Sequence, residues 1–72
     1  MAKQYICFDN NGALIGEHDA SEPVPAHAIR SRNYVLMKHD GKRQWYIIQS
    51  GHWTAIELKD VPATAQAWLL LV

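Results

Sequence analysis

The stretch that decides the fold is YVLMKHDGKRQWYIIQSGHWTAIEL, which spans residues 34–58. Three runs in it are rich in β-branched and aromatic residues, as strands are: residues 34–38, 43–48 and 53–58. Asp40 and Gly41 separate the first two runs, and Ser50 and Gly51 separate the last two. Such pairs favour the two-residue turns that join neighbouring antiparallel strands. The stretch therefore predicts a three-stranded antiparallel meander.

Two-residue turns also fix which residues lie opposite each other. The predicted pairs are Leu36–Trp45, Tyr34–Ile47, Trp45–Ile56 and Ile48–Trp53. Directly paired residues point to the same side of a sheet. One side, the Trp45 face, then carries Tyr34, Leu36, Trp45, Ile47, Thr54, Ile56 and Leu58, with Lys38 and Arg43 at one end. The other side, the Trp53 face, carries Val35, Met37, Tyr46, Ile48, Trp53 and Ala55, with Gln44 and Glu57. Neither face is polar, so both need a cover.

The Trp53 face is the predicted partner-binding surface. Burying one large apolar side chain is worth about 1.5–3 kcal/mol, which a domain of 72 residues can hardly forgo. The N-terminal segment offers Ile6, Phe8 and Ile15 as a cover. If that segment instead extends the edge of the sheet, the face stays open for a second copy or another protein. We expect a contact site centred on Trp53, and the candidate residues are Val35, Met37, Tyr46, Ile48 and Trp53.

The N-terminal segment predicts a β-hairpin, with strands over residues 3–9 and 13–18. Asn-Gly is a strong turn signal, so a two-residue loop at positions 11–12 places Phe8 opposite Ile15 and Ile6 opposite Glu17. A loop one residue earlier would shift this register and exchange the faces.

Prolines at positions 23 and 25 exclude a regular central strand over residues 19–28, and residues 24–29 predict a turn or one short helical turn. Farther along, Asp60, Val61 and Pro62 resemble a helix start. An apolar stripe at helical spacing follows: Val61, Ala65, Trp68, Leu69 and Val72. A final strand over residues 68–72 is the alternative. The expected fold is mainly β (α+β), a single domain over residues 1–72 with a short C-terminal helix, as one sheet or a small barrel.

Charge and composition argue against several functional classes. Seven Lys and Arg balance seven Asp and Glu, which removes the usual basis for broad nucleic-acid binding. The longest apolar run, residues 67–72, is too short to cross a membrane, and no signal-peptide pattern opens the chain. With one cysteine and no internal disulfide, we expect a small soluble intracellular protein.

The sequence shows no pattern typical of catalysis. His18, His27, His39 and His52 lack the close spacing of zinc ligands, and they flank predicted turns. Cys7 lies within the first predicted strand, where a thiol is usually buried and inert. We therefore expect no enzyme activity, no metal and no cofactor.

Basic residues gather at one hairpin tip. Lys38, Lys42 and Arg43 flank the turn at Asp40 and Gly41, with aromatic side chains nearby. Such a tip could bind single-stranded nucleic acid by charge and stacking. A solvated hairpin end whose charge discourages aggregation is the favoured interpretation.

Three elements together resemble small tail-fibre-associated proteins of tailed bacteriophages and prophages. They are Phe8-Asp9 followed by Asn-Gly, then residues 24–29 (VPAHAI), then Gly51-His52-Trp53 with Trp45 before it. The resemblance covers about residues 5–53. It implies a non-enzymatic protein–protein interaction module associated with tail fibres or tail assembly, whose partner is a phage structural protein. It also implies a location in the bacterial host cytoplasm or on the virion. The chain lacks the longer charged C-terminal helix of such assembly proteins, which leaves a virion-associated or accessory role open. A small phage-encoded inhibitor of a host protein is the alternative, and self-association fits either role.

Overall fold

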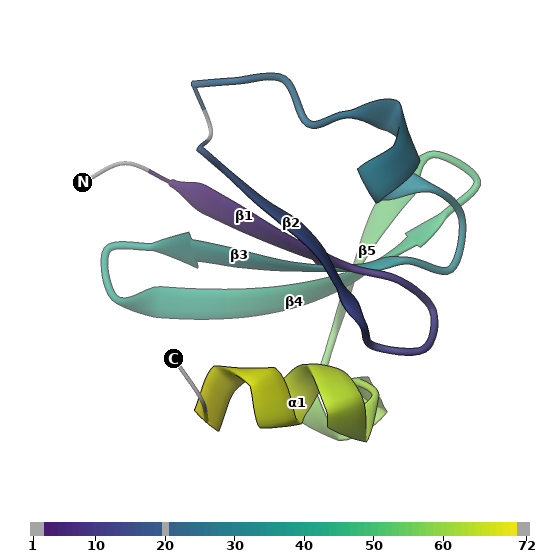
Figure 1. Ribbon diagram of the computed structural model, residues 1–72. Coiled ribbons are helices and arrows are strands. Elements are labelled where there is room, and N and C mark those ends of the chain that lie inside the picture. Colours follow the sequence, from purple (N-terminus) through teal and green to yellow (C-terminus); the bar gives the residue numbers. More distant parts are fainter. Residues whose placement is uncertain (1–2, 20, 71–72) are drawn as a thin grey trace.

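The computed structural model describes residues 3–19 and 21–70, and of residues 68–70 it describes only the backbone. The elements are β1 (Gln4–Phe8), β2 (Leu14–Asp19), η1 (Ala26–Ile29), β3 (Tyr34–His39), β4 (Lys42–Gln49), β5 (His52–Ile56), η2 (Leu58–Asp60) and α1 (Ala63–Leu70). The strands form one five-stranded antiparallel sheet in the order β2-β1-β3-β4-β5 (Figure 1). The mainly β fold is thus confirmed, and it is a single sheet rather than a barrel.

The meander of β3, β4 and β5 has the predicted register. Its two turns have positive φ at both central residues, 52° and 77° at Asp40 and Gly41, and 50° and 80° at Ser50 and Gly51. Two positive φ values are the signature of the type I′ turn, whose twist matches that of the flanking strands. All four predicted pairs are confirmed: Leu36–Trp45, Tyr34–Ile47, Trp45–Ile56 and Ile48–Trp53.

The N-terminal hairpin departs from its predicted turn. The Asp9 N–H donates to the Ala13 carbonyl (2.9 Å), so three residues form the loop instead of two. Asp9 Oδ1 accepts the N–H groups of Asn11 and Ala13, which stabilises the loop. Gly12 closes the loop in the left-handed region at φ 87°.

A bulge then restores the register in the rest of the hairpin. Phe8 pairs with Leu14, so the predicted Phe8–Ile15 pair is wrong, whereas Ile6 pairs with Glu17 as predicted. The irregularity lies between Cys7 and Phe8, and Ile15 is the extra residue.

The hairpin extends the sheet, because β1 pairs with β3. This is the second of the two predicted options. Ile6 and Phe8 therefore lie on the Trp45 face and do not cover the Trp53 face, whereas Ile15 packs at the margin of the Trp53 face. The core of the Trp45 face consists of Ile6, Phe8, Leu36, Trp45, Val61 and Ala65, with Tyr34 and Ile56 at its margin. The rings of Phe8 and Trp45 have centroids 5.3 Å apart.

Helix α1 packs beside this core, on the opposite side of the sheet from η1 (Figure 1). Strand β5 ends at Ile56, two residues before the predicted end, and η2 leads into α1. The Gln66 side chain donates to the carbonyls of Leu58 and Val61, both at 2.8 Å, and so ties α1 to the turn before it.

Of the predicted stripe, Val61 and Ala65 are buried. Residues 68–70 are helical, so the alternative of a final strand is wrong there. The side chains of Trp68 and Leu69, and Val72 as a whole, lie outside what the structure describes.

The connector between β2 and β3 covers part of the Trp53 face. Its residues 26–29 form the short helical turn η1, which was one of the two predicted options. Ala28 packs there in a buried cluster with Cys7, Val35 and Ile48. At the cluster's margin lie Tyr5, Ile15, Val24, Ile29 and Trp53. The buried Asn33 side chain donates to the Ala28 carbonyl (3.1 Å) and holds η1 in place.

Candidate functional site

The structure divides the five predicted partner-binding residues into two groups. Val35 and Ile48 have 0% of their surface exposed, because η1 lies over them. Their assignment as contact residues is therefore corrected: they are core residues that a partner cannot reach. Met37, Tyr46 and Trp53 are partly exposed. The hairpin extends the sheet and does not cover the Trp53 face. The connector covers part of that face instead, and only the remaining part is open.

Trp53 lies at the border between the covered and the open part. Its ring meets that of Tyr5 edge-on, with centroids 5.5 Å apart and an interplanar angle of 80°. The Tyr46 ring is tilted by 59° against it, with centroids 5.8 Å apart. Edge-on and tilted ring contacts are the favourable ones, so these three side chains support one another.

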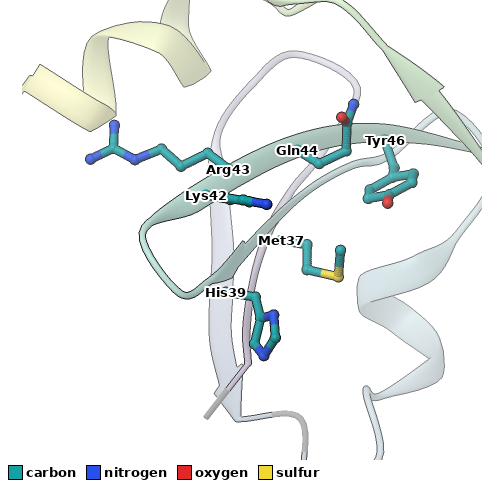
Figure 2. A pocket seen from close by; sticks show the side chains of 6 residues that line it. All are labelled: Met37, His39, Lys42, Arg43, Gln44 and Tyr46. Carbon is teal, nitrogen blue, oxygen red and sulfur yellow. The ribbon is translucent and has the colours of Figure 1, made fainter. Parts of the chain in front are cut away.

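The open part of the Trp53 face is a shallow depression of about 520 Å³ near the β3–β4 turn. Figure 2 shows its lining residues, Met37, His39, Lys42, Arg43, Gln44 and Tyr46. We call Met37, His39, Lys42, Gln44 and Tyr46, which share one face of the sheet, the exposed strip. His39 and Lys42 were not among the residues predicted for the site. The alternation of side chains along a strand was the signal for them, since His39 follows Met37 by two positions.

The polar groups of the exposed strip differ in their hydrogen-bond and ion-pair partners. Gln44 Nε2 donates to the carbonyls of Trp45 (3.0 Å) and Ile56 (3.2 Å), which fixes the amide against the end of β5. His39 Nε2 lies 3.5 Å from Asp40 Oδ2. The exposed Lys42 side chain has no ion-pair partner among the described residues. Met37 and Tyr46 in the depression are therefore flanked by a cation, Lys42, that can pair with the carboxylate of a partner.

The basic hairpin tip does not form one positive surface. Lys38 and Arg43 pair directly across β3 and β4, which places both on the Trp45 face, while Lys42 lies on the Trp53 face. Figure 2 shows the Arg43 and Lys42 side chains extending to opposite sides. Trp45, only 6% exposed, offers no ring for base stacking. The basic residues of the tip are therefore divided between two faces and do not line one groove for a nucleic-acid strand.

The cysteine lies in an environment that suppresses its reactivity. Cys7 is fully buried in the cluster beneath η1. Burial disfavours the thiolate and raises the pKa of the Cys7 thiol to about 11. A thiol that stays protonated at neutral pH is a poor nucleophile.

The described part of the chain contains neither a cluster of metal ligands nor a membrane-spanning helix. No three histidine, cysteine, aspartate or glutamate side chains gather there as metal ligands would. No described helix is long and apolar enough to span a membrane.

Comparisons of the chain with known protein families, with curated protein sequences and with solved structures find no match.

Proposed function

We propose that this chain is a non-enzymatic protein–protein interaction module whose partner docks on the exposed strip. One observation carries the proposal. Met37 and Tyr46 remain partly exposed on the part of the Trp53 face that η1 does not cover. Tyrosine is enriched among residues that dominate binding energy, and methionine adapts its shape to a partner.

The charge around the depression indicates what kind of partner fits. Lys42 is among the residues that line it on the Trp53 face, and none of the lining residues is acidic. A complementary segment would place an apolar or aromatic side chain over Met37 and a carboxylate near Lys42. We therefore infer a protein partner with an acidic residue beside an apolar anchor.

The resemblance of residues 5–53 to tail-fibre-associated proteins supports a phage or prophage origin. On that ground we propose a tail-fibre or other tail protein as the partner. An inhibitor of a host protein would use the same strip, so the identity of the captured protein distinguishes the two roles.

The experiment is capture on the immobilised chain from a lysate of phage-producing bacteria, with the bound proteins identified by mass spectrometry. Met37→Ala and Tyr46→Ala should each reduce capture of a tail protein about tenfold, as expected when a contact residue near the centre of an interface is truncated. Leu14→Ala is the matched control. Leu14 is exposed on the edge strand β2, away from the exposed strip, so this variant should capture as much as the wild type. Capture of a host protein that depends on the same strip would favour the inhibitor role. Equal capture by the strip variants and the control would refute the site.

A further inference from the structure

The two edge strands of the sheet differ in how they are protected against pairing with another strand. β2 carries Glu17, Asp19 and the bulge at Ile15, all devices that discourage edge-to-edge pairing. β5, with the sequence HWTAI, has no Lys, Arg, Asp, Glu or proline, and its pairing with β4 is regular. Thr54 and Ala55 are exposed. The β5 edge is therefore the unprotected one.

The backbone of β5 presents a defined set of hydrogen-bonding groups to this open side. On the neighbouring strand, the Ile48 N–H donates to Asn33 O (2.9 Å) and Ile48 O accepts the Arg32 N–H (2.7 Å). Both groups of Ile48 thus point away from β5, so the Ile48–Trp53 pair is a non-hydrogen-bonded one.

Because such pairs alternate, Tyr46–Ala55 is also non-hydrogen-bonded. The N–H and C=O groups of Trp53 and Ala55 consequently point outward. No described residue bonds to them.

We propose that β5 pairs with the β5 strand of a second copy of this chain, antiparallel and around a two-fold axis at Thr54. In this register Trp53 lies opposite the partner's Ala55, and Ala55 opposite the partner's Trp53. The outward groups of both strands then meet in two hydrogen-bonded pairs. Shifting the two-fold axis to either neighbouring residue would bring in Gly51 or Glu57, which lie outside β5.

The side chains fit the same register. On the Trp53 face, the small Ala55 lies between Tyr46 and the position that the partner's Trp53 would take, and so leaves room for that indole. On the Trp45 face, two exposed threonines would meet at the axis, and Thr–Thr is a favourable cross-strand pair. The chain's net charge is zero, so two copies repel each other only weakly.

This dimer goes beyond the proposed function. It uses the edge of the sheet, and neither Met37 nor Lys42 takes part, so this end of the exposed strip stays free for another protein. The two sheets would join into one continuous ten-stranded sheet with a strip on each half.

Sedimentation velocity over a dilution series tests the proposal. The wild-type chain should show a dimer that dissociates on dilution. Thr54→Lys places like charges opposite each other at the axis and should weaken the dimer at least about tenfold. Thr54→Glu should do the same, and mixing the T54K and T54E chains should restore a dimer, since only a two-fold contact brings the two positions together. Leu14→Lys on β2 is the matched control and should behave as the wild type.

Hydrogen exchange gives a second measurement that needs no variant. The amides of Trp53 and Ala55 should become more protected as the protein concentration rises, whereas that of Glu17 should not. A wild-type chain that stays monomeric at the highest soluble concentration would overturn the proposal. So would a dimer that T54K leaves intact. The capture experiment on the strip has its own readout, so either proposal can fail alone.

Discussion

Gly12 is the point at which the N-terminal hairpin touches the start of α1, and replacing it with alanine tests how closely the two are packed. A Cβ atom on Gly12 would lie 2.9 Å from the Ala65 nitrogen, 3.0 Å from Pro62 Cβ and 3.1 Å from Thr64 Cβ. None of these neighbours can rotate away, since the backbone fixes the position of a backbone nitrogen and of a Cβ atom. The hairpin loop or the helix must therefore shift.

The expected cost has two parts. Gly12 has φ 87°, and an L-residue in the left-handed region costs about 1–2 kcal/mol. Overpacking a close contact adds about 1–3 kcal/mol. The smaller entropy of the unfolded alanine chain returns about 0.4–1 kcal/mol. Gly12→Ala should thus lower the free energy of unfolding by about 2–4 kcal/mol, a large share of the total stability of so small a domain.

Gly41 provides the matched control. Its φ is 77°, close to that of Gly12, yet a Cβ there would meet nothing within 4 Å. Gly41→Ala should therefore cost only about 0.5–1.5 kcal/mol, since the packing part is absent. Urea unfolding followed by tryptophan fluorescence measures both variants. Equal losses for G12A and G41A would show that the loop and α1 are not in close contact, and the reasoning would be refuted.

Two further predictions follow from the buried clusters. The Cys7 thiol has a pKa of about 11 in the folded chain against 9.0 as its ordinary value, so the unfolded chain loses its proton first as the pH rises. Between those two pH values, the free energy of unfolding of the wild type should fall by about 2–3 kcal/mol more than that of Cys7→Ala. Urea unfolding at each pH measures both. If the two variants lose the same free energy, the thiol is not buried as the structure shows. Trp45→Ala should cost about 3–5 kcal/mol and leave little folded protein by circular dichroism, because Trp45 is buried against Phe8. Trp53→Ala should keep a cooperative unfolding transition, since Trp53 is partly exposed. If Trp53→Ala were less stable than Trp45→Ala, the assignment of Trp45 to the main core would be refuted.

The parts of the fold that could be predicted are those set by local chemistry. Two turns with positive φ at both positions determine the register of the whole meander, and the alternation of side chains then assigns every residue to a face. The length of the N-terminal loop is not determined by the same signal, because Asn-Gly suits both a two-residue loop and the end of a three-residue loop. The bulge at Ile15 compensates for the extra loop residue, which is why Ile6–Glu17 was right and Phe8–Ile15 was wrong.

The candidate site was predictable only in part for a related reason. Met37 and Tyr46 belong to the Trp53 face by alternation alone. The burial of Val35 and Ile48 depends instead on where the connector packs, which is decided by contacts between distant residues. The packing of the small Ala28 in one cluster with Cys7 and Ile48 has no local signal in the sequence.

The strand order has a consequence for the speed of folding. Short turns close the β1–β2 hairpin and the β3–β4–β5 meander, so each can form within microseconds. The hairpin and the meander join through the pairing of β1 with β3. This pairing requires the intervening segment, which contains β2 and η1, to close into a loop first. Such non-local pairing is the slow step in small β proteins. Changes at Cys7 or Val35, on either side of that ladder, should therefore slow refolding, whereas changes in the β4–β5 turn should mainly speed unfolding.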